Sequence, residues 1–277
     1  MRYLIVLTIL INLISKSTLS HPLNNIDNNI ESFGILEIYA QIKLKDRIFC
    51  NPLIQSCNKN ISIAILSMNS LLSKVPVLKS SSVCIESNNI STFITANHVC
   101  DEIDNANNET DSFKDSINTI MNNLKSINPD VKNSDVIIQF YYHIKNINNK
   151  KFKIVKIGKR LKDFDLCLLK IEGKYESESK ISKRIPKIGD LIYNIAIPEG
   201  IQFKDTLPIF TGIYSGTYES DDSNYSYLLS IPASQGSSGS PVFNSNGEII
   251  GIIYAAFKNF SHLSIASTLD QVKTLTK

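Results

Sequence analysis

The sequence carries little net charge of either sign, and this absence limits the partners that we expect. Among 277 residues, 29 lysines and arginines stand against 26 aspartates and glutamates, which gives a formal charge of +3. Proteins that bind nucleic acid neutralise phosphates with a clustered excess of positive charge. We therefore expect no nucleic-acid partner, and we interpret the basic run 150–162 as the solvated face of a strand.

Long apolar runs are also missing, apart from one at the N-terminus. The stretch MRYLIVLTILINLISKSTLS combines Arg2, an apolar run and small polar residues that end at Ser20. This layout is typical of a secretory signal peptide and is too short to span a bilayer comfortably, although a buried strand, a helix or an uncleaved anchor is the alternative. We expect residues 1–20 to direct export, with cleavage after Ser17 or Ser20. The protein would then be secreted or periplasmic, with no stable membrane span after signal removal.

Cysteines are few, five in all, and their pattern does not fit a zinc site. No pair of cysteines is accompanied by a second cysteine pair or by the histidine partner that a zinc site needs, so we expect no metal. In an oxidising compartment, four are candidates for disulfides. Cys50 and Cys57 flank a short loop, Cys84 and Cys100 flank an expected hairpin, and the spacing leaves all three connectivities open. Cys167 lies in the apolar run DLCLLKI and is predicted to be a buried free thiol.

From Ile61 onward, short apolar runs rich in β-branched and aromatic residues alternate with polar turns. They are SSVCIES, STFITANHV, DVIIQFYYHI, KFKIVKIG, DLCLLKI, DLIYNIAI, SYLLSI, SPVF, EIIGIIYAAF and LSIAS. Many short strands without intervening helices favour an all-β sandwich or barrel. The charged stretch GKYESESKISKR, residues 173–184, is the best linker and divides the strands into two groups.

Other stretches depart from the strand pattern. DEIDNANNETDSFKDSINTIMNNLKSINPD has apolar residues at helical spacing and predicts an inserted helical loop. The tail STLDQVKTLTK predicts a terminal helix, with Ser267 and Asp270 spaced as a capping box. Residues 21–56 are rich in asparagine and weakly patterned, which favours a leader, a pro-segment or a peripheral arm. The remaining chain then divides into a β-domain at 57–175 and another at 176–277.

Glycine is scarce, yet two of the 11 glycines, Gly236 and Gly239, stand on either side of Ser238 in the stretch QGSSGSPVFNSNGEIIG. A serine hydroxyl is a poor nucleophile at neutral pH unless a positioned base takes its proton. Histidine, the usual base, is also scarce. The four histidines are His21, His98, His143 and His262. Of these, His98 ends the run STFITANHV, where a strand is expected to give way to a loop.

A catalytic histidine needs a carboxylate that fixes its tautomer and stabilises the imidazolium. Asp165 opens the apolar strand DLCLLKI, which would hold a carboxylate at the edge of a core, and Asp163 is its near rival on the same face. A different triad of Ser238, Glu248 and His262 would need the chain order of an α/β-hydrolase. Too few residues follow Ser238 to build that fold, so we reject this alternative.

The order His98, Asp165, Ser238 is that of chymotrypsin-type enzymes. The motifs around these residues resemble those of trypsin-like serine peptidases, nearest to the HtrA-type and glutamyl-endopeptidase families. ITANHV resembles the histidine motif, DLCLLKI the aspartate strand, GSSGSPVFNSNGEIIGI the nucleophile loop, and PKIGDLIYNIAIPEG the start of the second barrel. The resemblance covers roughly residues 58–275. It implies a chymotrypsin-like fold of two six-stranded antiparallel β-barrels with the active site between them.

The resemblance also implies a role for each residue. His98 would act as the base, Asp165 would orient it, and Ser238 would attack the peptide carbonyl. The backbone N–H groups of Gly236 and Ser238 would form the oxyanion hole, with Gly236 in a conformation that favours glycine. No cofactor is implied, and the expected partner is a protein or peptide substrate.

The same correspondence predicts the specificity pocket. Pro232 would form its base, and its walls would be Ala233, Gln235, Tyr254, Ala255 and Ala256. No acidic residue stands there to attract a lysine or arginine before the scissile bond, and Ile253 replaces the histidine of glutamyl endopeptidases. We therefore expect a small or apolar residue at this substrate position. The strand 254–256 should pair with the substrate backbone.

The family also has a cysteine pair on either side of its histidine, which favours a bridge between Cys84 and Cys100. Ser237 stands where digestive proteases keep the aspartate of their activation switch, so we expect that switch to be absent. Two rival functions stay open: a catalytically silent binding module on the same fold, and a protease that acts mainly on its own leader.

Overall fold

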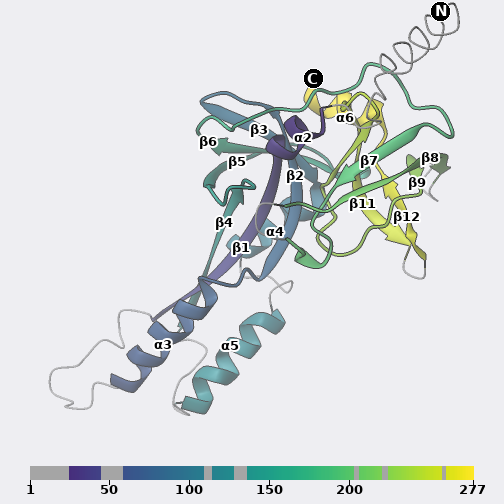
Figure 1. Cartoon of the computed structure of the whole chain (residues 1–277). Coiled ribbons are helices and arrows are strands. Elements are labelled where there is room, and N and C mark those ends of the chain that lie inside the picture. The colour runs from purple at the N-terminus through teal and green to yellow at the C-terminus, as the bar shows by residue number, and fades with distance from the viewer. Residues whose placement is uncertain are drawn as a thin grey trace, which may run out of the picture.

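The computed structural model describes residues 25–44, 59–108, 114–127, 136–202, 206–219, 224–257 and 260–277. These residues form two closed barrels, each built from six antiparallel strands. The barrels lie side by side in Figure 1, the first in purple to teal and the second in green to yellow. The predicted all-β class with two six-stranded barrels is confirmed. The expected signal peptide lies outside the described residues.

The first barrel follows the strand order β1-β2-β3-β6-β5-β4 and closes where β4 meets β1. Strand β5 begins with alternating burial: Phe152 and Ile154 are buried, whereas Lys151 and Lys153 are exposed. In β5, this alternation points apolar side chains into the barrel and leaves the lysines in water. The strands are β1 (Phe33–Leu44), β2 (Leu78–Glu86), β3 (Ile90–Ala96), β4 (Val136–Lys145), β5 (Lys151–Leu161) and β6 (Leu166–Glu172).

The second barrel follows the order β10-β11-β12-β9-β8-β7 and closes where β7 meets β10. Its core includes Ile192, Leu229, Val242 and Ile250, all of which are buried. The strands are β7 (Leu191–Ile195), β8 (Ile209–Glu219), β9 (Tyr225–Leu229), β10 (Pro241–Asn244), β11 (Ile249–Phe257) and β12 (Phe260–Ala266).

Strand β1 falls within residues 21–56, where we expected a leader or peripheral arm, and it corrects that expectation for Phe33–Leu44. It pairs with β2 on one side and β4 on the other, so it is an integral part of the first barrel. Leu36 and Ile38 belong to the core inside this barrel, whereas Phe33 and Ile35 pack in a cluster shared with the second barrel. Because both faces of the strand are buried, its sequence lacks the alternation that identifies a half-buried strand.

A buried carboxylate lies on β1. The side chain of Glu37 is 1% exposed, and it accepts hydrogen bonds from Lys145 Nζ at 2.8 Å and Tyr39 Oη at 2.9 Å. His143 Nε2 lies 3.2 Å from the second carboxylate oxygen. Burial by itself raises the pKa of Glu37, but the hydrogen bonds of His143 and Lys145 and the charge of Lys145 outweigh it and lower this pKa to about 2.

The helices lie outside the barrels. They are α2 (Ile26–Ser32), α3 (Lys59–Leu72), α4 (Asn97–Asn108), α5 (Lys114–Ile127) and α6 (Leu269–Thr276), with short 3-10 turns η4 (Lys162–Phe164) and η5 (Pro198–Gly200). The predicted helical insertion and terminal helix are therefore present, whereas α3 was not predicted. Thr268 and Gln271 form the capping box of α6, one residue beyond the expected pair. Each described helix is too short or too polar to cross a lipid bilayer.

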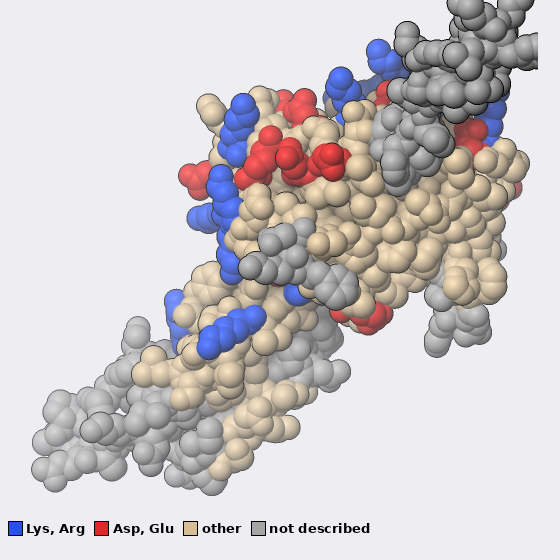
Figure 2. Space-filling view, viewed as in Figure 1, with Lys and Arg blue, Asp and Glu red and all other residues tan. Residues whose placement is uncertain are grey.

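Helices α3 and α5 project away from the barrels in Figure 1. A small separate core joins them to the far ends of β1 and β4, with Ile65 on α3 and Ile120 and Met121 on α5. In the space-filling view, charged side chains of both signs lie close together along the first barrel, and a broad uncharged area covers the middle of the same face (Figure 2).

Each end of the described chain packs on the opposite barrel. In α2, which precedes the first barrel, Asn29 Nδ2 donates to Tyr193 Oη at 2.7 Å and to the Gly247 carbonyl at 3.0 Å. Helix α6 follows the second barrel and contacts β5 and β6 of the first. Lys159 Nζ donates to the Thr274 carbonyl at 2.7 Å, and Val272 packs in the shared apolar cluster. Both segments therefore hold the barrels together.

Candidate active site

His98 and Asp165 come together where two neighbouring strands end. Strands β3 and β6 pair antiparallel up to Ala96 and Leu166, so the residues just beyond this pair, Asn97 and Asp165, remain adjacent. The Asn97 N–H donates to the Asp165 carbonyl at 3.0 Å. Asp165 itself has the left-handed φ of 49° at the end of η4. The strand register therefore brings this carboxylate to the start of α4, where His98 stands.

The Asp165 carboxylate contacts His98 in two ways. One oxygen accepts the backbone N–H of His98 at 2.7 Å, and the other lies 2.6 Å from Nδ1 of the ring. In the neutral imidazole, this arrangement places the proton on Nδ1 and leaves Nε2 as an acceptor. The His98 side chain is 46% exposed, so the ring is open to solvent. The rival Asp163 is exposed, and its backbone carbonyl accepts from Asn224.

The surroundings of His98 favour its charged form. Burial lowers the pKa of the imidazole, but the hydrogen bond and the charge of Asp165 outweigh this effect. Glu102 and Asp101 add smaller contributions in the same direction, and the pKa of His98 is raised above 6.5. A histidine of this kind accepts a proton more readily than a free imidazole does.

Ser238 lies on the loop between β9 and β10, residues 230–240, which we call the serine loop and which is fastened to the first barrel. Its carbonyl accepts hydrogen bonds from Ser80 Oγ at 2.7 Å and from the Ser81 N–H at 3.0 Å. Gly239, with φ of +84°, packs so tightly that a Cβ there would lie 2.1 Å from Thr95 Oγ1. Thr95 is three residues before His98, so these contacts bring the serine loop to the end of β3. In the part of the chain that the structure describes, no hydrogen bond joins Ser238 Oγ to His98.

Some backbone donors of this loop have no partner among the described residues, and two of them stand at the predicted oxyanion positions. The N–H groups of Gly236 and Ser238 have no acceptor among the described residues. The N–H groups of Ser237, Gly239 and Ser240 do have acceptors, which are the carbonyls of Ser234, Ile253 and Ser237, respectively. Gly236 has φ of +92°, and a Cβ there would lie 2.4 Å from the Ile197 carbonyl oxygen. Only glycine fits this backbone without strain.

A pocket of about 380 Å³ opens beside Ser238. The predicted wall residues line it together with others, namely Ala233, Ser234, Gln235, Ser237, Ser238, Ile253, Tyr254, Ala255, Ala256 and Phe257. Pro232, predicted as its base, is half-buried and is not among these residues. All the lining side chains are uncharged.

A second pocket, of about 460 Å³, adjoins the same loop at Gln235 and Gly236. Its other walls are the segment 74–79, which connects α3 to β2, and Glu199 and Gly200 on η5. Residues 74–79 were not predicted to contribute to the site. The two pockets therefore both adjoin the serine loop, and they share Gln235 as a lining residue.

The serines that fasten the loop were not predicted either. Ser80, Ser81 and Ser82 are at most 2% exposed. Ser80 and Ser81 donate their hydroxyls to the Ser238 and Gly236 carbonyls of the loop, whereas Ser82 donates to the Gly34 carbonyl on β1. Three consecutive serines within one strand, in the stretch KSSSVCIE, are the signal that could have indicated such contacts, because buried hydroxyls need partners.

The cysteine pairing differs from the prediction. Cys100 is bonded to Cys167, and Cys84 is a buried free thiol, so both the expected Cys84–Cys100 bridge and the expected free Cys167 are wrong. The cause is that α4 begins directly after β3 and turns Cys100 toward β6 instead of β2. Cys50 and Cys57 lie outside the described residues. Within those residues, no three His, Cys, Asp or Glu side chains are grouped so that they could hold a metal ion.

Comparison with known proteins supports the assignment that the fold suggests. No curated protein matches the chain. The family described as "trypsin-like peptidase domain" matches residues 80–252, more than half of the 277 residues, and the match includes His98, Asp165 and Ser238. Taken with the two six-stranded barrels, this match shows that the chain belongs to the trypsin-like peptidase domain family.

Proposed function

We propose that this protein is an exported serine endopeptidase that cleaves peptide bonds with His98, Asp165 and Ser238. The observation that carries the proposal is the double contact of Asp165 with His98, made beside a loop whose Gly236 and Ser238 N–H groups are free. A buried disulfide is consistent with an oxidising, extracytoplasmic compartment.

The proposed reaction begins when Ser238 Oγ attacks the carbonyl carbon of the scissile bond and His98 Nε2 takes the hydroxyl proton. Asp165 stabilises the imidazolium that forms. The negative charge on the carbonyl oxygen would be stabilised by the N–H groups of Gly236 and Ser238, which have no other acceptor among the described residues. Contact between His98 and Ser238 would tighten when substrate binds, as catalytic hydrogen bonds commonly do.

Collapse of this intermediate breaks the C–N bond. His98 donates its proton to the leaving amine, and the acyl group stays on Ser238. Water then enters, His98 takes one of its protons, and the hydroxide attacks the ester carbonyl. Release of the acid restores the serine hydroxyl and the neutral imidazole. No cofactor takes part in the proposed cycle.

The two pockets suggest how a peptide lies across Ser238. The side chain before the scissile bond would enter the pocket formed by Ala233 and strand 254–256, whose uncharged lining favours a small or apolar group. The backbone on that side would pair with the strand 254–256. The residues after the scissile bond would then lie in the pocket formed by residues 74–79.

A fluorophosphonate probe tests the proposal because it reacts with an activated serine. We expect the folded protein to be labelled and Ser238→Ala to lose the label. Ser126→Ala, which removes an exposed hydroxyl on α5, is the matched control and should keep it. A folded wild-type protein that takes no label would favour the binding module, and labelling that persists in Ser238→Ala would place the nucleophile elsewhere.

Export and self-processing are tested together by mass spectrometry of the protein released by expressing cells. A mature N-terminus after Ser17 or Ser20 in both wild type and Ser238→Ala supports a signal peptide removed by another enzyme. An N-terminus that changes in Ser238→Ala would instead support a protease that processes its own leader.

A further inference from the structure

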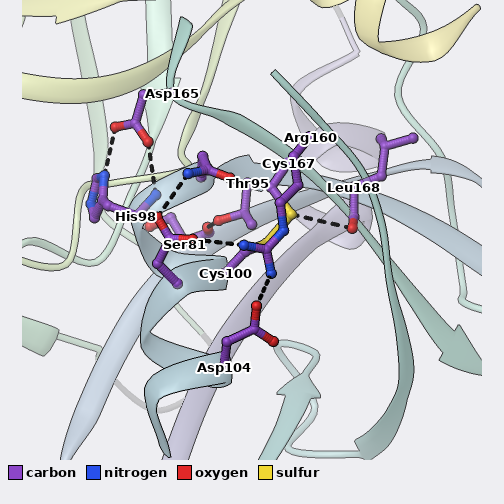
Figure 3. The surroundings of a disulfide bond; sticks show 11 residues. Ser81, Thr95, His98, Cys100, Asp104, Arg160, Asp165, Cys167 and Leu168 are labelled. Carbon is purple, nitrogen blue, oxygen red and sulfur yellow. Dashed lines mark hydrogen bonds and ion pairs between the residues drawn. A yellow bond between two sulfur atoms is a disulfide. The ribbon is translucent and has the colours of Figure 1, made fainter. Parts of the chain in front are cut away.

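A disulfide lies directly beside the His98–Asp165 pair. Cys100 is two residues after His98, and Cys167 is two residues after Asp165, so the bridge and the hydrogen-bonded pair both span 67 residues of chain. The Cα atoms of the two cysteines are 6.5 Å apart. Figure 3 shows the bridge with the imidazole and the carboxylate nearby. A covalent cross-link and a hydrogen-bonded one therefore close the same loop at neighbouring points.

The bridge acts where the strand ladder no longer holds the chain. Pairing of β3 with β6 ends at Ala96, and His98 belongs to the first turns of α4. Apart from the N–H bonds of Asn97 and His98 to Asp165, the direction in which α4 leaves the barrel depends on its own contacts. Cys100 supplies one of these contacts through its disulfide with Cys167, and both cysteines are fully buried in the core of the first barrel.

Arg160 holds the same helix from another strand. Its guanidinium, on β5, bonds Asp101 at 2.6 Å and also bonds Asp104, one turn further along α4. These two carboxylates lie on one side of the helix because residues three apart share a face. Helix α4 is therefore held against β6 by a covalent bond and against β5 by an ion pair (Figure 3).

We propose that Cys100 and Cys167 are positioning residues for the proposed peptidase reaction: their bridge fixes the first turn of α4 on β6, which keeps the imidazole of His98 in contact with the carboxylate of Asp165. The inference rests on the proposed function. Without the bridge, the fold retains its barrels, but the imidazole turns away from Asp165 for part of the time.

The charges around His98 give this role a measurable signature. The carboxylate of Asp165 reaches the ring from the end of η4, and Asp101 and Glu102 act on it from α4, while Arg160 from β5 faces Asp101. Loosening the first turn of α4 weakens the contact with Asp165, which is the strongest of these stabilising influences. The pKa of His98 then falls toward its ordinary value, and the acid limb of the pH profile moves to lower pH.

The experiment compares the double variant Cys100→Ala/Cys167→Ala with Cys84→Ala, which removes the third buried cysteine of the same core cluster without touching the bridge. We expect the double variant to lose about 10- to 100-fold in kcat with a small change in KM. Its acid limb should also move to lower pH. Cys84→Ala should keep the kcat and the acid limb of the wild type, even if its melting temperature falls.

A double variant that melts at lower temperature but keeps the wild-type kcat and pH limb would overturn the inference, because the bridge would then serve stability alone. If this variant does not fold, Cys100→Val/Cys167→Ala restores most of the lost volume and is compared in the same way. A wild type that neither cleaves peptides nor takes the fluorophosphonate label would refute the proposed function itself, which is a different outcome.

Discussion

Replacing Gly239 with alanine should disrupt the contact between the serine loop and the first barrel. Gly239 has φ of +84°, a conformation that costs an alanine about 1–3 kcal/mol. The new Cβ would lie 2.1 Å from both the Ser81 carbonyl oxygen and Thr95 Oγ1, and overpacking of this kind costs about 1–3 kcal/mol more. It would also separate these two oxygens, whose hydrogen bond of 2.8 Å is worth about 1 kcal/mol.

Together these effects should lower the free energy of unfolding by about 3–7 kcal/mol, a large part of the usual stability of a protein domain. Gly189→Ala is the matched control, because Gly189 has a similar φ of +89° and a Cβ there would meet nothing within 4 Å. This control should lose only the conformational cost, about 1–3 kcal/mol.

Equilibrium unfolding in guanidinium chloride measures both variants against the wild type. Equal losses in Gly239→Ala and Gly189→Ala would refute the reasoning, because the close approach of the serine loop to Ser81 and Thr95 would then carry no energy. At temperatures where Gly239→Ala stays folded, its kcat should fall about 100-fold, since Ser238 moves with the loop.

The remaining predictions concern charge. Asp165→Asn should lower kcat/KM for peptide hydrolysis by about 10⁴-fold, because an amide cannot stabilise the imidazolium. Asp163→Asn should leave kcat/KM unchanged. Equal losses in the two variants would contradict the assignment of Asp165 as the partner of His98. In the wild type, the acid limb of the kcat/KM profile should lie above pH 6.5, because the base must be neutral and the pKa of His98 is raised. An acid limb at or below pH 6.5 would count against His98 as the base. Glu37→Gln should lower the free energy of unfolding at pH 7 by about 3 kcal/mol. Because the pKa of Glu37 is lowered from 4.5 to about 2, its contribution is complete above pH 4.5 and is lost as the pH falls toward 2. Denaturant curves of the two proteins should therefore converge at about pH 2, and equal stability at pH 7 would show that the carboxylate contributes nothing.

Much of the candidate site was predictable because its residues stand in short local motifs. His98 and Ser238 could be identified from their immediate neighbours in the sequence, in the strand STFITANHV and the loop GSSGSP. The opening of the strand DLCLLKI likewise indicated Asp165. The local backbone also explains some of the residues in these motifs. Gly236 and Gly239, for example, both have a positive φ, which favours glycine.

What the sequence did not reveal depends on contacts between distant segments. Strand β1 is buried on both faces, so its pattern lacks alternation, and β8 is interrupted by Gly212 and Gly216. Cysteine spacing permits several connectivities, and the choice of Cys100 with Cys167 follows from the direction in which α4 leaves β3. Ser80 and Ser81 act on a loop more than 150 residues away, which no local pattern indicates.

The exchange of terminal helices between the barrels has a consequence for how the molecule can be divided. Helix α2 is anchored through Asn29 to the barrel that follows later in the chain, and α6 returns to the one that came first. A single backbone cut between Glu172 and Leu191 would therefore yield two fragments that stay associated, because each carries a helix that packs on the other barrel. Each barrel thus lends one helix to the packing of the other, and the serine loop on the second barrel is fastened to the first through Ser80 and Ser81.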